Sequence, residues 1–288
     1  MAGRPAVQTT NKKEEETMYD HKVPGMGARV RALSPQSRNW SLKSLQTQED
    51  VRVQCHLATG LREALRDIGV HKAFAPHVVL ASAQIADRNA FKQPIDLGEG
   101  RHLYRNQDVP ADGVFIGKGH AFVMSSGGCP IIISTAGEQM IVAHAGRDSL
   151  VDRGAVTGNP TRPHVSVVNA IVEAFLERGA TLRDISMCMM FSISASLFTH
   201  SLIDLNHGTY NYALWEFIKG RWPSGVVRHK NNMLLSLEML FEEQAREAGV
   251  RNVWYTNSLE EFPRLAHTRD GLGSDRRNLF IVKREQAA

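Results

Sequence analysis

The feature that most constrains this chain is the segment 125–149, SSGGCPIIISTAGEQMIVAHAGRDS. Two short apolar stretches, PIIIS and QMIVA, flank the tetrapeptide TAGE, and this pattern indicates a β-hairpin. If Ala136-Gly137 forms a two-residue loop, Cys129 lies directly opposite His144 and both side chains point to the same face. A slip of one residue would turn one of them away. The segment therefore predicts a thiol and an imidazole in contact at the open end of the hairpin.

This pair suits nucleophilic chemistry. A cysteine reacts as the thiolate, and a neighbouring histidine can hold the thiol in that form. The backbone amides around Gly127 and Gly128 can face a developing oxyanion, because glycine permits close approach. Ser125 and Ser126 are candidates for the pocket wall. We expect attack by the Cys129 sulfur on a carbonyl carbon, proton delivery by His144, and hydrolysis. The alternative is a structural cysteine and a loop histidine at a hairpin end.

Composition narrows the class of protein. The chain has 288 residues, 42% of them hydrophobic and 22% charged, which fits a globular protein with a substantial core. The net charge of +4 comes without a basic block interleaved with aromatics, so we expect no nucleic-acid partner. No apolar run reaches the roughly 20 residues of a membrane span. Three cysteines without a CxxC pair favour a reducing compartment, the cytoplasm.

Hydrophobic periodicity predicts a single α/β domain over residues 23–288, a mixed central sheet flanked by helices, after a disordered tail over residues 1–22. The polar tail is also compatible with delivery of the protein elsewhere. Thr47 and Asp50 resemble a capping box, and Gly69 is the expected stop of that helix. Cys55 and Cys188 are expected to be buried packing residues. Further helices are expected over 164–178, 204–220 and 231–248, strands over 77–82, 113–116, 121–124, 185–194, 252–255 and 278–282, and loops over 87–108 and 148–163.

The sequence resembles the bacterial YfiH-like, or laccase-domain, proteins over most of its length. SGGCPIII resembles their TADCxPVLL strand, and VAHAGRDSL resembles AAHAGWRG. VPADGVF, ISMCMMFSIS and HTRDGLGSDRRNLFIV resemble the ADALVT, IGPSIG and FSYRRDGxTGR segments. The resemblance implies a YfiH-like fold. It also implies zinc-dependent purine nucleoside phosphorolysis or adenosine deamination, with zinc held by a histidine from QVHG, the cysteine and the HAG histidine.

Cys129 and His144 match the last two of those ligands. The QVHG position reads QIAD, so Ala86 replaces the first ligand, and a zinc site would need a replacement such as His102 or His120. The aspartate before the family's cysteine is Gly128 here. The SGGC segment is similar instead to the SGC motif of the cytotoxic necrotizing factor catalytic domains, which share the fold. Those domains deamidate a glutamine on host GTPases with a cysteine and a histidine and without metal.

Three hypotheses follow. The first is a Cys129–His144 hydrolase acting on a C–N bond of a small amide or of a protein glutamine side chain, with no cofactor. The second is a zinc-dependent purine nucleoside enzyme using Cys129, His144 and His102. The third is an inactive binding protein of this fold. Besides Ser126, Gly127 and Gly128, the candidates for binding an anionic substrate group are Arg147, Arg269, Arg276 and Arg277.

Overall fold

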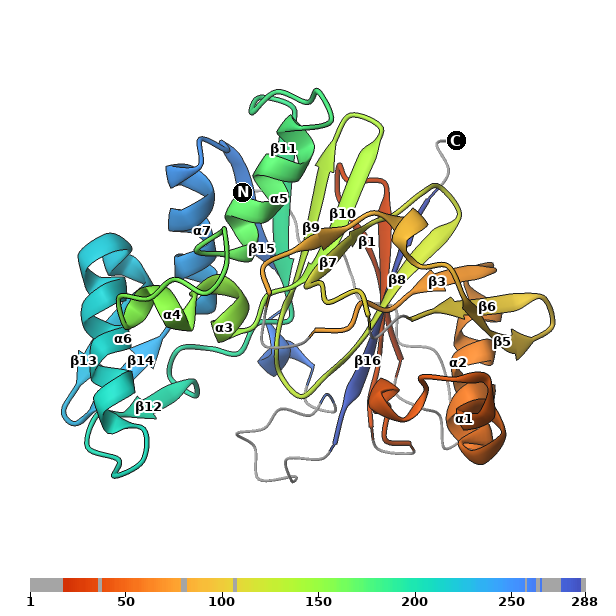
Figure 1. Cartoon of the computed structure of the whole chain (residues 1–288), viewed down its shortest axis with the longest axis horizontal. Helices are drawn as coiled ribbons and strands as arrows, with labels where there is room; N and C mark the ends of the chain where they lie inside the picture. The colour runs from red at the N-terminus through yellow and green to blue at the C-terminus, as the bar shows by residue number, and fades with distance from the viewer. Residues whose placement is uncertain are drawn as a thin grey trace.

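Two β-sheets packed face to face form the centre of the molecule (Figure 1). The structure, a computed structural model, describes residues 18–35, 38–78, 82–105, 108–256, 258–262, 265 and 276–285. Helices cover the outer face of each sheet, so the layers run helix, sheet, sheet, helix. The α/β class is confirmed, and the expected central sheet is divided into two.

The first sheet has seven strands in the order β1-β2-β16-β8-β3-β6-β5. Its outer face packs on the helix pair α1 (Gln48–Val53) and α2 (Cys55–Asp67). Leu61 and Leu65 of α2 are fully buried there, because the apolar residues of this helix recur on one side. The strands are β1 (Met18–Val23), β2 (Ala28–Leu33), β3 (Lys72–Phe74), β5 (Pro94–Gly98), β6 (Arg101–Tyr104), β8 (His120–Ser126) and β16 (Asn278–Arg284).

The second sheet has six strands in the order β15-β11-β9-β10-β7-β4. Its outer face packs on α5 (Val167–Leu176) and α7 (Leu237–Glu247). The strands are β4 (Ile85–Ala86), β7 (Gly113–Phe115), β9 (Ile131–Ala136), β10 (Gln139–His144), β11 (Ile185–Met190) and β15 (Asn252–Thr256). The buried β11 matches its continuous apolar sequence, which suits a strand covered on both faces.

A smaller layer extends this half of the molecule, at the left of Figure 1. It consists of a three-stranded sheet and α6 (Gly208–Arg221). Two short helices, α3 (Arg147–Leu150) and α4 (Arg153–Val156), follow β10 directly. The three strands are β12 (Thr199–Ser201), β13 (Val226–His229) and β14 (Asn232–Leu235), and the 3-10 helices are Leu42–Ser44, Arg88–Ala90, Pro223–Gly225 and Leu259–Glu261.

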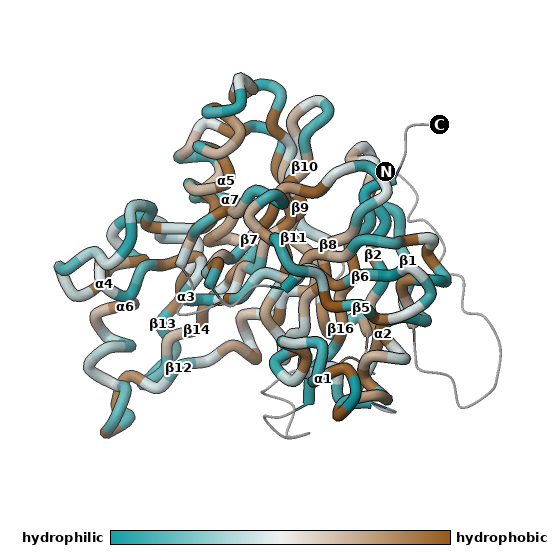
Figure 2. Tube along the Cα trace, turned by 45° about the vertical axis from the view of Figure 1, so that its right-hand side comes forward, coloured by the Kyte–Doolittle hydropathy of each residue, from teal (hydrophilic) through white to brown (hydrophobic). Residues whose placement is uncertain are grey.

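The core between the two sheets is almost wholly apolar. Phe122 and Phe280 come from the first sheet and Ile133 and Val142 from the second, and each is fully buried. Figure 2 shows the hydrophobic colour concentrated on these central strands and the hydrophilic colour on the outer loops. In the described part of the chain, no helix is both long and apolar enough to cross a membrane.

Several local predictions are confirmed. Thr47 caps α1 with the reciprocal hydrogen bonds of a capping box, through Asp50. Gly69 ends the helical region with a φ of +64°, which glycine adopts without strain. Cys188 is fully buried in β11, as expected. The helices at 164–178 and 204–220 correspond to α5 and α6.

Other predictions are wrong. Residues 87–108 were expected to form a loop, but they contain the β5–β6 hairpin. Residues 18–22, expected in the tail, pair with β2 as part of β1. Residues 148–163 contain α3 and α4, and Cys55 is exposed at the start of α2. The strand expected at 77–82 falls partly outside the described residues, and only an isolated bridge at His77 is seen there. Residues 1–17 of the expected tail lie outside the described residues.

Candidate active site

The hairpin that carries the predicted pair has a different register from the expected one. Ala136 pairs with Gln139, so Gly137-Glu138 forms the loop, and His144 faces Ile131. The first position of such a loop favours a positive φ, and Gly137 takes +53° where alanine would be strained. The pairing is displaced by two residues rather than one. Because side chains alternate with a period of two, Cys129 and His144 still share a face.

Gly146 makes the contact between thiol and imidazole possible. Continuing the ladder places Gly146 opposite Cys129, and the Ala145 amide donates to the Pro130 carbonyl at 2.9 Å, as that register requires. A Cβ atom on Gly146 would lie 2.9 Å from His144 Nε2 and 3.1 Å from Cys129 Sγ. The missing side chain therefore leaves the space in which the two groups meet diagonally across the hairpin.

We expect Gly146→Ala to displace the thiol from the imidazole and to slow alkylation of Cys129 at neutral pH by about 10- to 30-fold, because a free thiol with a pKa of roughly 8.5 is only a few per cent thiolate at pH 7. The fold should survive, since the φ of −65° at Gly146 is ordinary for alanine. Iodoacetamide kinetics with mass spectrometry of the Cys129 peptide would measure this. Gly220→Ala on α6, where an added Cβ meets nothing within 4 Å, is the matched control. Equal rates in both variants would contradict this role of Gly146.

Asp112, which the sequence did not single out, completes a triad with the predicted pair. It is fully buried just before β7, and its Oδ1 lies 3.1 Å from His144 Nδ1. Its Oδ2 accepts the Ala83 amide at 2.5 Å. Strand pairing brings it there, because Gly113 of β7 faces Ala143 of β10. The one signal in the sequence was an aspartate set among apolar residues in VPADGVF, since a buried carboxylate needs partners.

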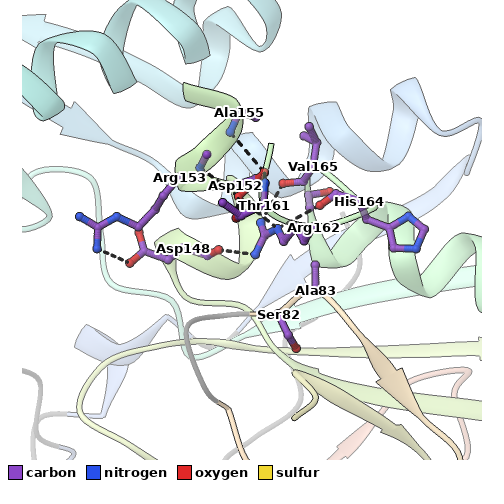
Figure 3. A network of polar contacts seen from close by, with 12 residues as sticks. Ser82, Ala83, Asp148, Asp152, Arg153, Ala155, Thr161, Arg162, His164 and Val165 are labelled. Carbon is purple, nitrogen blue, oxygen red and sulfur yellow. Dashed lines mark hydrogen bonds and ion pairs between the residues drawn. The ribbon is translucent and has the colours of Figure 1, made fainter. Parts of the chain in front are cut away.

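A second layer of hydrogen bonds holds this aspartate and histidine. The buried Ser149 hydroxyl donates to Asp112 Oδ1 at 2.7 Å and lies 2.8 Å from His144 Nδ1. The Arg162 guanidinium, drawn in Figure 3, donates to the carbonyls of Asp148, Ser149, His164 and Val165. It thereby fixes the backbone on both sides of Ser149. The imidazole is held in one orientation, with Nδ1 toward the carboxylate and Nε2 toward Cys129.

The electrostatics favour a thiolate beside an imidazolium. Burial raises the pKa of the Cys129 thiol, but the His144 charge and hydrogen bond, with a contribution from Arg277, hold that pKa below its usual value. Burial lowers the pKa of His144, but the Cys129 thiolate and the hydrogen bond to Asp112 outweigh it and raise that pKa to about 10. The Cys129 thiolate and the His144 imidazolium stabilise each other, so that the thiolate, the nucleophilic form of cysteine, is favoured at neutral pH.

The loop before Cys129 is shaped by Ser126. Its hydroxyl accepts the Gly128 amide at 3.0 Å and donates to the Cys129 carbonyl at 2.8 Å. The Gly128 amide is therefore engaged, and Gly128 has the positive φ, +123°, that favours glycine. Gly127 is half-buried in the same loop, and the Ser125 hydroxyl accepts the Leu42 amide. Within the described residues nothing accepts the Cys129 amide, which leaves that N–H as the candidate oxyanion donor.

The fold does not bring His102 or His120, the additional zinc ligands considered from the sequence, close to Cys129 and His144. His102 on β6 and His120 on β8 both pair with Lys72 of β3, so both lie at the level where β8 begins. The Cys129 loop follows the other end of β8, at Ser126. Six residues of strand separate the two levels by about 20 Å. Ala86 is buried on β4 and has no ligating atom. The residues present do not fit a three-ligand zinc site, and the described ranges contain no group of three His, Cys, Asp or Glu that could hold a metal ion.

The four candidate arginines fall in different places. Arg147 begins α3 directly after Gly146 and pairs with the Asp148 carboxylate at 2.8 Å. Arg277 lies close enough to affect Cys129, and its carbonyl accepts the Trp40 amide. Arg276 is exposed, and Arg269 lies outside the described residues.

Solved structures with the same architecture are YfiH-like proteins. YlmD from Geobacillus stearothermophilus superposes with a TM-score of 0.67 at 15% identity, covering 96% of this chain and 98% of that one. The hypothetical protein YfiH of Bacillus licheniformis gives 0.62 at 12% identity, with 94% and 97% covered. The Neisseria meningitidis protein NMB0706, of family DUF152, gives 0.61 at 13% identity, with 93% and 99% covered.

The fold is therefore that of the YfiH-like proteins, and the expected resemblance is confirmed at the level of the fold. No protein-family model matches the sequence, and no curated protein matches it either.

Proposed function

We propose that this chain is a cysteine-dependent hydrolase that cleaves the C–N bond of an amide. Cys129 is the nucleophile, His144 the general acid and base, and Asp112 the group that orients and charges the imidazole. The observation that supports this most is the hydrogen-bonded order of thiol, imidazole and buried carboxylate, with Nδ1 of His144 3.1 Å from the carboxylate. This order is the arrangement by which cysteine and serine hydrolases on unrelated folds activate a nucleophile.

The reaction has two balanced steps. The Cys129 thiolate attacks the amide carbonyl carbon, and the oxyanion that forms accepts from the Cys129 N–H. The C–N bond breaks as His144 Nε2 gives its proton to the nitrogen, which leaves as ammonia or an amine, and a thioester remains. His144, now neutral, then takes a proton from water, whose oxygen attacks the thioester carbon. The products are a carboxylic acid and the regenerated thiolate–imidazolium pair.

Deamidation is the form of this reaction that we favour. The SGGC segment resembles the motif of glutamine deamidases, and a primary amide leaves as ammonia, which needs little space beside His144. The substrate is either a small amide or a glutamine side chain of a protein. Release of ammonia from a panel of amides, followed by glutamine-to-glutamate mass shifts in candidate proteins, would test both forms.

The pH dependence follows from the two pKa shifts. The pKa of Cys129 lies below its ordinary 9.0, so the acid limb of iodoacetamide alkylation should have its midpoint below pH 9.0. The pKa of His144 is raised to about 10, so amide hydrolysis should fall above that pH as the general acid loses its proton, while alkylation continues. A midpoint at the value of a free cysteine would instead support the inactive binding protein.

The YfiH-like fold is the observation that favours a second candidate, a zinc-dependent purine nucleoside enzyme. The placement of His102 and Ala86 argues against it. We expect elemental analysis to find less than about 0.1 zinc per chain, and chelator to leave hydrolysis unchanged, because two protein ligands are fewer than catalytic zinc usually has. One zinc per chain, lost in Cys129→Ser and accompanied by phosphorolysis of inosine or deamination of adenosine, would favour the purine enzyme.

A further inference from the structure

A polar pocket lies between the helices that follow β10 and the small three-stranded layer. Its volume is about 340 Å³. The wall includes Arg147 of α3, Arg153 of α4, Tyr210 of α6 and Thr199 of β12. All these elements belong to the part of the molecule at the left of Figure 1.

Two features relate the pocket to the triad. Arg147 follows Gly146 in the chain. Burial lowers the pKa of Arg147, but Asp148, and more weakly the Cys129 thiolate, raise it, so its guanidinium lies within electrostatic reach of the nucleophile. On the other side, the β9–β11 register pairs Met190 with Ile131, which brings the segment after β11 level with Cys129. The same segment continues into β12 and forms the pocket wall.

The charges of the pocket favour an anion. The guanidinium groups of Arg147 and Arg153 lie 5.8 and 4.8 Å from the centre of the Tyr210 ring. One carboxylate, Asp148, contacts both, at 2.8 Å from Arg147 and 3.9 Å from Arg153. The carboxylate on the opposite wall, Asp204, accepts the amides of its own turn and the ring of His207. Of the charged residues that line the pocket, two are arginines and one, Asp204, is a carboxylate, so the wall itself carries one positive charge in excess. Asp148, which contacts both arginines, is not among the lining residues.

We propose that the Arg147–Tyr210 pocket binds a carboxylate or phosphate group of the substrate and so presents its amide to Cys129. This assignment rests on the proposed hydrolase. It narrows the substrate class to amides that carry an anionic group at a distance from the scissile bond. Arg153 is the principal test position, because its side chain is 57% exposed and its replacement leaves the core untouched.

The test measures binding of glutarate and of inorganic phosphate by calorimetry, and the protection that glutarate, whose second carboxylate takes the place of the substrate amide, gives Cys129 against iodoacetamide. We expect Arg153→Gln to weaken binding and protection about tenfold, the loss of a charge-assisted hydrogen bond. Arg153→Lys keeps the charge but not the planar guanidinium, so its affinity should lie between those of wild type and Arg153→Gln. Arg246→Gln is the control, since Arg246 pairs with Glu242 on α7 outside the pocket wall.

Binding of glutarate alone identifies a carboxylate site, and binding of phosphate alone identifies a phosphate site. The inference is overturned if wild type binds neither anion, if Arg153→Gln binds both as tightly as wild type does, or if bound glutarate leaves Cys129 unprotected. Cys129→Ala should bind the anions as wild type does, so binding does not depend on catalysis. Arg153-dependent binding with protection, in a protein that hydrolyses no amide, would refute the hydrolase and leave the anion pocket standing.

Discussion

Cys129→Ala is expected to lower amide hydrolysis by about 10⁴-fold or more while the protein still folds. In the proposed reaction the sulfur forms the bond to the substrate, and removal of a nucleophile is among the most costly changes an enzyme can undergo. The fold should tolerate the change because the side chain is half-buried at a sheet end. The variant also removes the thiolate that raises the pKa of His144, so that pKa should fall from about 10.

Both effects are measurable on one sample. Ammonia release reports activity, and NMR titration of the His144 ring reports its pKa. Cys55→Ala, which removes an exposed thiol at the start of α2, is the matched control and should change neither. Full activity in Cys129→Ala would end the cysteine-hydrolase proposal, and an unmoved imidazole pKa would show that the ion pair does not exist.

Asp112→Asn is expected to retain the fold and to lose about 10³- to 10⁴-fold in activity, as when the carboxylate of a catalytic triad is made an amide. An amide cannot stabilise the imidazolium, and its NH₂ competes to donate where His144 Nδ1–H donates now. The pKa of His144 should fall, and with it the thiolate fraction of Cys129 at neutral pH. Alkylation at pH 7 should therefore slow in this variant.

Asp112→Ala should lower the free energy of unfolding more than Asp112→Asn does. It leaves the Ala83 amide, the Ser149 hydroxyl and the imidazolium without their common acceptor in a buried place, at a cost of about 3–5 kcal/mol. Ser149→Ala is the graded control, since it removes one donor and leaves the carboxylate in contact with His144. Denaturant unfolding would give the stabilities. Normal hydrolysis in Asp112→Asn would mean that the carboxylate serves only the fold.

The pairing of Cys129 with His144 could be predicted from the sequence because the hairpin brings the two residues together locally. The expected loop was wrong, but Cys129 and His144 still share a face, because the register differs by two residues and side chains alternate with a period of two. Asp112 could not be found in the same way. Its approach to His144 depends on the pairing of β7 with β10, although β8 and β9 lie between them in the chain. The only sign of this long-range pairing in the sequence is an aspartate among apolar residues.

In the fold too, local features could be predicted and long-range ones could not. The cap at Thr47 and the stop at Gly69 are local and were predicted. The β5–β6 hairpin was missed because only Ile95, Leu97 and Leu103 carry its inward pattern, and polar residues and two glycines surround them. The division into two sheets could not be predicted, because the apolar sequence of a strand does not indicate which sheet the strand joins.

The position of β16 has a consequence for how the protein is made. This strand is the last of the described strands in chain order, yet it lies between β2 and β8 in the seven-stranded sheet. Asn278 pairs with Ser126, and the Arg277 carbonyl holds Trp40, so the Cys129 loop gains its supports only when residues 277–284 are in place. Until then β2 and β8 each present an unpaired edge. A nascent chain translated only as far as β15 therefore still lacks the supports of the Cys129 loop, and the interval before β16 inserts is when the chain is most exposed to aggregation and most dependent on chaperones.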